Sequence, residues 1–417
     1  MRGVIWLLLL AVVAVVAASL LGPNDGLVSV YWGGWRTDLS LNLAVLLLVG
    51  LGAALLLGVQ AINSLVSLPR RAGQWRALRR ERAAEAALRE AQAEYFAGRY
   101  GRAQKAAQRA LVLQTDAEAL AGDARFRLLA RLLAAGSLHR LQDRRRRDAM
   151  VERALAERPG TAATGGVAGD DATRLLAAEW ALDDRDAGRA LEMLDALPPG
   201  AARRTQALRL RLQAARLARQ PVEALRTARL LANHQAFSPL VAQTLLRSLA
   251  GEVLETAHDL QQLRRLWNQL DAGDRRDAQV AARAAQRAAV LDGADDARQW
   301  LRPFWDRLAE LSREDRDSVA LALADARSGI GNDWLPRLEL AAQSYGHEPA
   351  VVAAVGLALA ERRLWGKART LLEQGAASAA LAPGLRRRAW RVLAEMARGE
   401  GDEGRALGHE RAAASLD

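Results

Sequence analysis

The segment WRVLAEMARGEGDEGRALGHERAA, residues 390–413, carries the clearest structural pattern in the chain. In its first predicted helix, Trp390 and Leu393 stand four residues and one residue before a small residue, Ala394, and all three lie on one face. Ala406 and Ala413 follow Ala394 by 12 and 19 residues, beyond a break at Gly401, and lie on a second predicted helix. Small side chains at such offsets let one helix approach another closely. The segment therefore predicts a helix pair packed through small residues.

The same spacing of small residues recurs toward the N-terminus. The complete and partial matches are Ala91 with Ala103 and Ala110, Ala178 with Ala190, Ala285 with Ala297, and Gly356 with Ala368. Ala190 and Ala224 are 34 residues apart, which is the period of the tetratricopeptide repeat (TPR). One match means little in an alanine-rich chain, but the recurring offset favours a TPR-like α-solenoid. An irregular helical bundle is the alternative.

The composition also favours an all-α fold. Hydrophobic residues make up 51% of the 417 residues and aromatic residues only 5%, so Ala, Leu and Val supply the apolar bulk. The net charge is +11, and every basic residue except Lys105 and Lys367 is Arg. We interpret this excess as a general Arg and Ala bias and expect no nucleic-acid binding. The lack of Cys excludes disulfides, Cys nucleophiles and iron–sulfur ligation.

Two uncharged apolar runs lie near the N-terminus. As a helix, residues 4–21 would span about 27 Å, close to the hydrocarbon thickness of a membrane, and Gly22-Pro23 would end that helix. The second run covers residues 39–68, with its apolar centre at 41–62. We therefore expect a two-helix transmembrane hairpin over residues 1–68. A cleaved signal peptide is the alternative for the first run.

Arginines directly after the second run determine the expected orientation. They are Arg70, Arg71, Arg76, Arg79, Arg80 and Arg82. The loop between the runs, about residues 22–40, has Arg36 as its one basic residue. The positive-inside rule then predicts a periplasmic loop, with both termini and the array in the cytoplasm. Within the loop, residues 27–35 predict a small β-ribbon, with Trp32 and Trp35 as anchors at the membrane interface.

The remainder divides by composition into four parts. An Arg-rich juxtamembrane segment at 69–84 precedes an N-terminal helical, TPR-like portion at 85–158. A flexible Gly-rich loop is expected at 159–171, followed by the main TPR-like array at 172–417.

No motif in the sequence indicates catalysis. A Walker A motif, HExxH, GxSxG and a GxGxxG that follows a strand are all absent. No histidine has another at metal-ligand spacing; the five are His139, His234, His258, His347 and His409. The carboxylate pairs at 183–184 and 295–296 are interpreted as helix-capping groups. We therefore expect no enzymatic activity, no metal site and no bound cofactor.

A solenoid offers a concave groove that suits an extended peptide or a partner helix. Candidate lining residues, chosen from their positions on the predicted helices, are Arg89, Gln92, Arg209 and Gln213. We therefore expect protein partners.

Two segments resemble the HemY family of proteobacterial inner-membrane TPR proteins associated with haem biosynthesis. They are GLVSVYWGGWRTDLSLNLAVLLL, residues 26–48, and RRAGQWRALRRERAAEAALREAQAEYFAGRYGRAQKAAQRAL, residues 70–111. The first is similar to the family's Gly-x-Val-x-Val strand, acidic residue and second span. The second is similar to its basic helix and Gly-Arg-Tyr turn. The rest of the array matches only as generic TPR.

The resemblance implies a multi-pass protein of the bacterial inner membrane with a non-catalytic role in a late step of protohaem synthesis, recruiting haem-biosynthesis enzymes. Two alternatives stay open. One is an adaptor for another inner-membrane or envelope assembly. The other is a direct carrier of a porphyrin or haem, for which the isolated histidines give little support. The flavin-dependent oxidase that shares the family's name is not implied, because the chain has no dinucleotide fingerprint.

Overall fold

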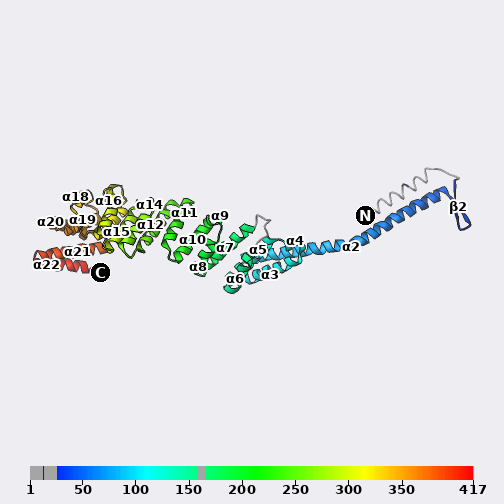
Figure 1. Ribbon diagram of the computed structural model, residues 1–417, viewed down its shortest axis with the longest axis horizontal. Helices are drawn as coiled ribbons and strands as arrows, with labels where there is room; N and C mark the ends of the chain where they lie inside the picture. The colour runs from blue at the N-terminus through cyan, green and yellow to red at the C-terminus, as the bar shows by residue number, and fades with distance from the viewer. Residues whose placement is uncertain (1–12, 14–25, 157–165, 417) are drawn as a thin grey trace. The chain divides into compact units, whose positions relative to one another are not determined.

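The computed structural model describes residues 13, 26–156 and 166–416. Within these residues the fold is helical apart from one short hairpin of strands (Figure 1). The expectation of an all-α fold is confirmed. The chain divides into two compact units, Met1–Gly169 and Asp170–Asp417.

The hairpin consists of β1 (Leu27–Trp32) and β2 (Trp35–Ser40), which pair antiparallel from Leu27 opposite Ser40 to Trp32 opposite Trp35. Gly33 and Gly34 form the turn with φ angles of 53° and 89°. Both angles lie in the left-handed region that glycine enters without a steric penalty, as two-residue hairpin turns require. The predicted β-ribbon is therefore present.

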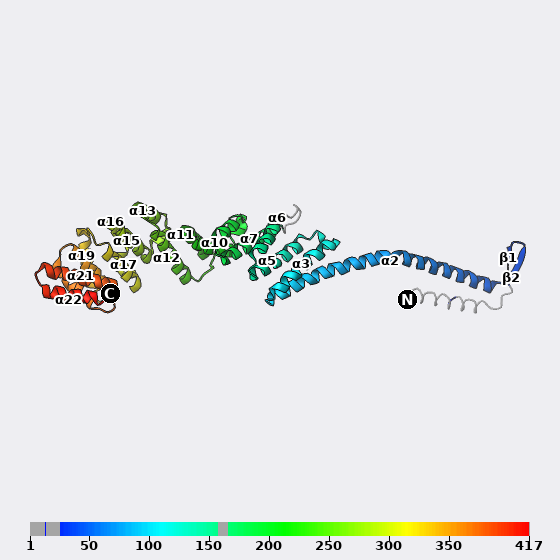
Figure 2. The ribbon, with the colours of Figure 1, turned by 90° about the horizontal axis from the view of Figure 1, so that it is seen from below.

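A single helix, α2 (Leu41–Phe96), follows the hairpin directly (Figure 2). The Ser40 hydroxyl caps it by accepting a hydrogen bond from the Leu43 amide at 3.4 Å. The helix contains the second apolar run, the Arg-rich segment and the first stretch that packs in the array. The sequence-based boundaries at 68 and 84 mark changes of polarity that do not interrupt the helix, although Pro69 lies within it.

Four more helices complete the first unit: α3 (Tyr100–Asp116), α4 (Glu118–Ala121), α5 (Ala124–Arg140) and α6 (Arg144–Ala156). Contacts join α2 to α3, α3 to α5 and α5 to α6. The core between them is small. It consists mainly of fully or almost fully buried alanines, with Phe126 as its large side chain.

The second unit begins within α7 (Gly166–Asp183), which starts inside the stretch that the sequence marked as a loop. The following helices are α8 (Ala187–Asp195), α9 (Pro199–Ala202), α10 (Thr205–Leu217), α11 (Pro221–Asn233), α12 (Pro239–Glu255), α13 (Leu260–Gln269), α14 (Ala272–Arg275), α15 (Ala278–Val290), α16 (Ala294–Trp305), η1 (Leu308–Glu310), α17 (Arg313–Asp325), η2 (Asn332–Trp334), α18 (Leu335–Ser344), α19 (Pro349–Glu361), α20 (Trp365–Ala377), α21 (Pro383–Gly399) and α22 (Glu403–Ala414).

These helices pack chiefly on their neighbours in the sequence, as in a helical solenoid. Examples are α10 with α11, α15 with α16 and α17, and α19 with α20 and α21. One hydrophobic core runs from Leu208 to Met396. Helix α19 is its centre, because every residue from Val351 to Ala360 is buried.

Acidic residues begin several of the helices. The Asp186 and Asp402 carboxylates accept hydrogen bonds from the amides of Arg189 and Arg405, at 3.0 Å each. The pair Asp295 and Asp296 lies instead in the first turn of α16, where negative charge stabilises the helix.

Candidate functional site

The N-terminal part of α2 has the properties of a membrane span. Residues Leu41–Gln60 form 20 helical residues with a mean hydropathy of 2.4, long and apolar enough to cross a membrane. At 1.5 Å per residue they cover about 30 Å. Large apolar side chains such as Leu48 and Leu56 are about 70% exposed, because no other described residue covers them. Only this one span is found among the described residues. The expected first span at 4–21 lies outside them, apart from Val13.

The hairpin before this span is polar on one side and aromatic at its tip. The Asp38 carboxylate accepts hydrogen bonds from the Ser29 hydroxyl at 2.5 Å and from Arg36 Nε at 3.1 Å. Trp32 and Trp35 are exposed on either side of the glycine turn. Exposed indoles beside an apolar helix are typical of a membrane interface, so the interfacial-anchor role stays a prediction for both.

Beyond the span, α2 continues as a basic stalk, by which we mean residues 61–83. The helix rises about 36 Å between Gln60 and the first buried core residue, Ala84, at about 1.5 Å per residue. The backbones of Arg70 and Arg71 belong to this helix, and the side chains of Arg76, Arg79, Arg80 and Arg82 are exposed. The Arg79 guanidinium lies 5.4 Å from the centre of the Trp75 ring. One helix thus links the apolar span to the array through a positively charged segment.

The last turns of α2 serve as the first helix of the array. Ala84, Ala87 and Ala91 are buried on the face that packs against α3 and α5. Two ion pairs surround this contact, Arg109 with Glu90 and Arg99 with Glu94. The hydrogen bond from Arg99 lowers the pKa of Glu94 below its usual value. The helix ends at Phe96, and Gly98 follows with a φ of 74° that suits the reversal into α3.

The structure places the small residues chosen from the sequence in the helix interfaces. All are buried: Ala91, Ala103, Ala110, Ala178, Ala190, Ala224, Gly356, Ala368, Ala394, Ala406 and Ala413. Leu393 is buried as well. Trp390 is half-buried and stacks on His409 with ring centres 5.3 Å apart. These positions have the surroundings that a packing role requires.

The predicted groove residues do not form one described site. Arg89 and Gln92 lie on α2 in the first unit, and Arg209 and Gln213 lie on α10 in the second. Arg209 and Gln213 are exposed. Arg89 is exposed too and pairs with Glu85 of its own helix at 2.5 Å.

No group of three or more His, Asp or Glu side chains is placed to hold a metal ion within the described residues. His139 is buried, with Nδ1 3.0 Å from Arg147 Nη1, whereas His234, His258 and His347 are exposed. Two carboxyls have altered acidity. Burial raises the pKa of Asp274, although Arg229 pairs with it, and burial also raises the pKa of Asp317. In both cases burial outweighs nearby arginines, which act in the opposite direction.

One feature of the array was missed from the sequence. Arginines of the second unit reach acidic groups of the next or previous helix pair, commonly about 30 residues away. The pairs are Arg247 with Asp277, Arg264 with Asp296, Arg316 with Glu348, Arg337 with Asp306, and Arg369 with Glu400. The Arg316–Glu348 pair is bidentate, at 2.9 and 2.5 Å, and Glu348 is buried. We refer to these five pairs as the inter-repeat ladder. Five of the arginines thus have a structural use.

Comparison with known proteins gives one family match. No curated protein matches the chain. A solved structure described as "Structure of Naa15/Naa10 bound to HypK-THB" is 13% identical, with a TM-score of 0.25 over 76% of this chain and 56% of that one. The chain therefore spans little more than half the length of that protein, and so low a TM-score supports no conclusion about fold. Residues 26–140 match the family described as "HemY protein N-terminus", a region that covers the hairpin, α2, α3 and α5. Over this N-terminal region, little more than a quarter of its length, the chain is similar to the HemY family.

Proposed function

We propose that the protein is a non-catalytic, membrane-anchored scaffold with a TPR-like array. It acts in a late step of protohaem synthesis by holding partner enzymes at the cytoplasmic face of the inner membrane. The family match supports the link to haem biosynthesis. The scaffold role rests on one structural observation, which is that α2 is both the apolar span and the first helix of the array.

The physical benefit of such a scaffold is proximity. Enzymes that bind one anchored array are confined to a small volume near the membrane, so that a poorly soluble intermediate passes between them at high effective concentration. A helical array suits this task because stacked helix pairs present an extended surface. The basic stalk supports the proposed orientation, since arginines flanking a span are retained on the cytoplasmic side.

Affinity capture from membranes tests this proposal. The tagged full chain is compared with a chain that ends at residue 99 and with a chain that lacks residues 1–68, and co-purified proteins are quantified by mass spectrometry. We expect tetrapyrrole enzymes with the full chain, none with the truncated anchor although it still inserts, and loss of membrane retention without the anchor. Enrichment of envelope or secretion proteins in place of tetrapyrrole enzymes would refute the haem assignment.

A further inference from the structure

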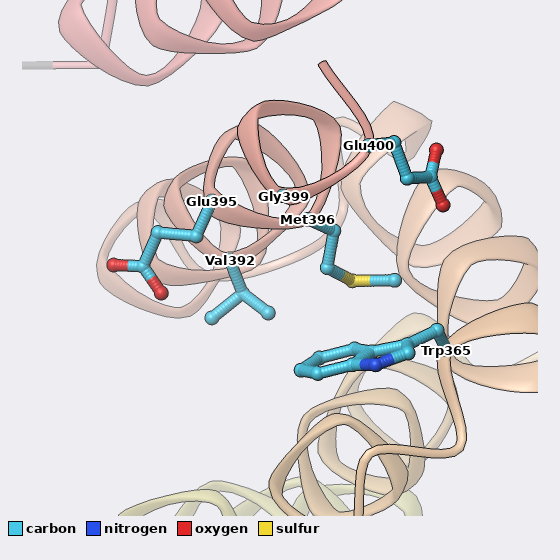
Figure 3. A pocket seen from close by; sticks show the side chains of 6 residues that line it. All are labelled: Trp365, Val392, Glu395, Met396, Gly399 and Glu400. Carbon is cyan, nitrogen blue, oxygen red and sulfur yellow. The ribbon is translucent and has the colours of Figure 1, made fainter. Parts of the chain in front are cut away.

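A cavity of about 220 Å³ lies between the start of α20 and the last turns of α21. Its lining residues are Trp365, Val392, Glu395, Met396, Gly399 and Glu400 (Figure 3). In Figure 3 the indole of Trp365 lies below Met396 and Val392, and the two glutamates lie on opposite sides. We call it the α20–α21 pocket. It is smaller than the roughly 300–1,000 Å³ of typical small-molecule sites, so its volume suits one side chain rather than a tetrapyrrole.

The local sequence explains why the space is open. Gly399 is the last residue of α21, and a Cβ atom at this position would meet no atom within 4 Å. Trp365 is the first residue of α20 and remains 45% exposed, although Met396 beside it is buried. An aromatic face and the absence of a side chain at 399 therefore create a partly apolar hollow with solvent access.

One carboxylate at the pocket is available to a cation. Glu395 is exposed and has no ion pair with any other described residue, whereas Glu400 is paired with Arg369. The carboxyl end of α21 adds partial negative charge at the same place. A Trp face attracts a cation, and apolar neighbours such as Val392 and Met396 suit a methylene stem. The exposed Trp face, the apolar neighbours and one carboxylate without an ion pair among the described residues thus occur together at one open pocket.

We propose that the α20–α21 pocket receives a single arginine or lysine side chain from a short basic segment of a partner protein. The aliphatic stem lies against Trp365 and Met396, and the charged end meets Glu395. This proposal rests on the proposed function in one respect, which is that the array is the part of the chain that binds protein partners. Its geometry is independent of haem synthesis.

Saturation-transfer NMR on the full chain in detergent micelles tests the pocket, because this method detects weak binding. The probe is the peptide acetyl-Ala-Leu-Arg-Leu-Ala-amide, compared with the same peptide carrying Lys or Gln in place of Arg. We expect the strongest transfer to the Arg or Lys methylene protons and at least fivefold weaker binding of the Gln peptide. Equal binding of the Gln peptide would overturn the proposal.

Three variants locate the binding. Gly399→Leu fills the cavity without changing its charge and should abolish the transfer. Glu395→Gln should weaken binding by about threefold to tenfold, as expected for loss of one charge partner. Glu373→Gln changes an exposed glutamate elsewhere on α20 and should leave binding unchanged. Circular dichroism verifies that each variant is folded. Unchanged binding in folded Gly399→Leu would show that the peptide binds elsewhere and would refute the assignment.

The two proposals can fail separately. If peptide binding is absent while tetrapyrrole enzymes still co-purify, the pocket assignment is wrong and the scaffold role stands. If the peptide binds as expected but no tetrapyrrole enzyme is captured, the role in haem synthesis is wrong and the pocket stands.

Discussion

The substitution Gly356→Ala tests the close packing of helix pairs. Gly356 lies in the middle of the fully buried helix α19 and faces α20. A Cβ atom at this position would lie 2.9 Å from both Cγ and Cδ2 of Leu372 and 3.2 Å from the Leu372 backbone nitrogen. Leu372 is itself completely buried and has little room to move. Even one added methyl group must therefore push the two helices apart or distort Leu372.

The expected cost combines two opposing effects. Overpacking a filled core costs about 1–3 kcal/mol. Replacing Gly by Ala inside a helix stabilises it by about 1 kcal/mol. We expect a net loss of about 1–2 kcal/mol, because both a buried side chain and a backbone atom are contacted.

Gly408→Ala is the matched control. Gly408 lies within α22, and a Cβ atom there would meet nothing within 4 Å. This substitution should stabilise the chain by about 0.5–1 kcal/mol through helix propensity alone. The two variants should therefore differ by about 2 kcal/mol, or about 4–8 °C in Tm for a unit of this size.

Thermal and urea unfolding of the full chain in detergent, followed by circular dichroism at 222 nm, measures both variants. Because arrays can unfold in stages, the midpoint of the transition is compared rather than an extrapolated free energy. If Gly356→Ala is as stabilising as Gly408→Ala, the close approach of α19 and α20 is incorrect, and with it the packing role assigned to the small residues.

Further predictions concern the ladder, pH, the span and the topology. Arg316→Met removes the bidentate guanidinium partner of the buried Glu348 and should cost about 3 kcal/mol in urea unfolding, whereas Arg89→Met, at an exposed pair, should cost less than about 0.5 kcal/mol. Burial raises the pKa of Asp274, so the folded chain holds this proton to a higher pH than the unfolded chain does. Wild type should therefore lose stability relative to Asp274→Asn as the pH rises from about the usual Asp value, and the difference should level off above the folded pKa; a difference that does not vary with pH would contradict this. Leu51→Arg places a charge in the span at a cost of about 2.5–3.5 kcal/mol and should reduce the membrane-bound fraction on cell fractionation. A reporter that is active only in the periplasm should be inactive when fused after Asp417, and activity there would reverse the proposed orientation.

Local sequence patterns predicted the features that depend on local physics. The offsets of small residues around Ala394 and Gly356 identified positions that the structure buries, because a helix pair repeats its geometry with a fixed spacing. Gly33-Gly34 lies between two short segments that mix apolar and polar residues, and this pattern predicted the β-ribbon. Few residues other than glycine adopt the positive φ angles that the turn of such a ribbon requires. The apolar run beginning near Leu41 predicted the span by length and composition.

Features that depend on tertiary placement were not predictable in the same way. The continuity of α2 was hidden because the segment changes from apolar to charged at Pro69, a residue that usually ends or kinks a helix. The Arg316–Glu348 pair joins residues 32 apart, and an arginine-rich chain offers many competing partners at similar spacings. The α20–α21 pocket arises from the placement of Trp365 against a helix end that has no side chain at 399, and neither residue reveals it alone.

Porphyrin intermediates, measured by fluorescence and mass spectrometry in a strain that lacks this protein, test the proposed role in protohaem synthesis most directly. The strain is complemented with the full chain or with a chain lacking residues 1–68. We expect a late intermediate to accumulate, and we expect the full chain but not the unanchored array to restore the normal profile. An unchanged porphyrin profile in the deletion strain would contradict a role in protohaem synthesis. Full rescue by the unanchored array would contradict the requirement for the membrane anchor.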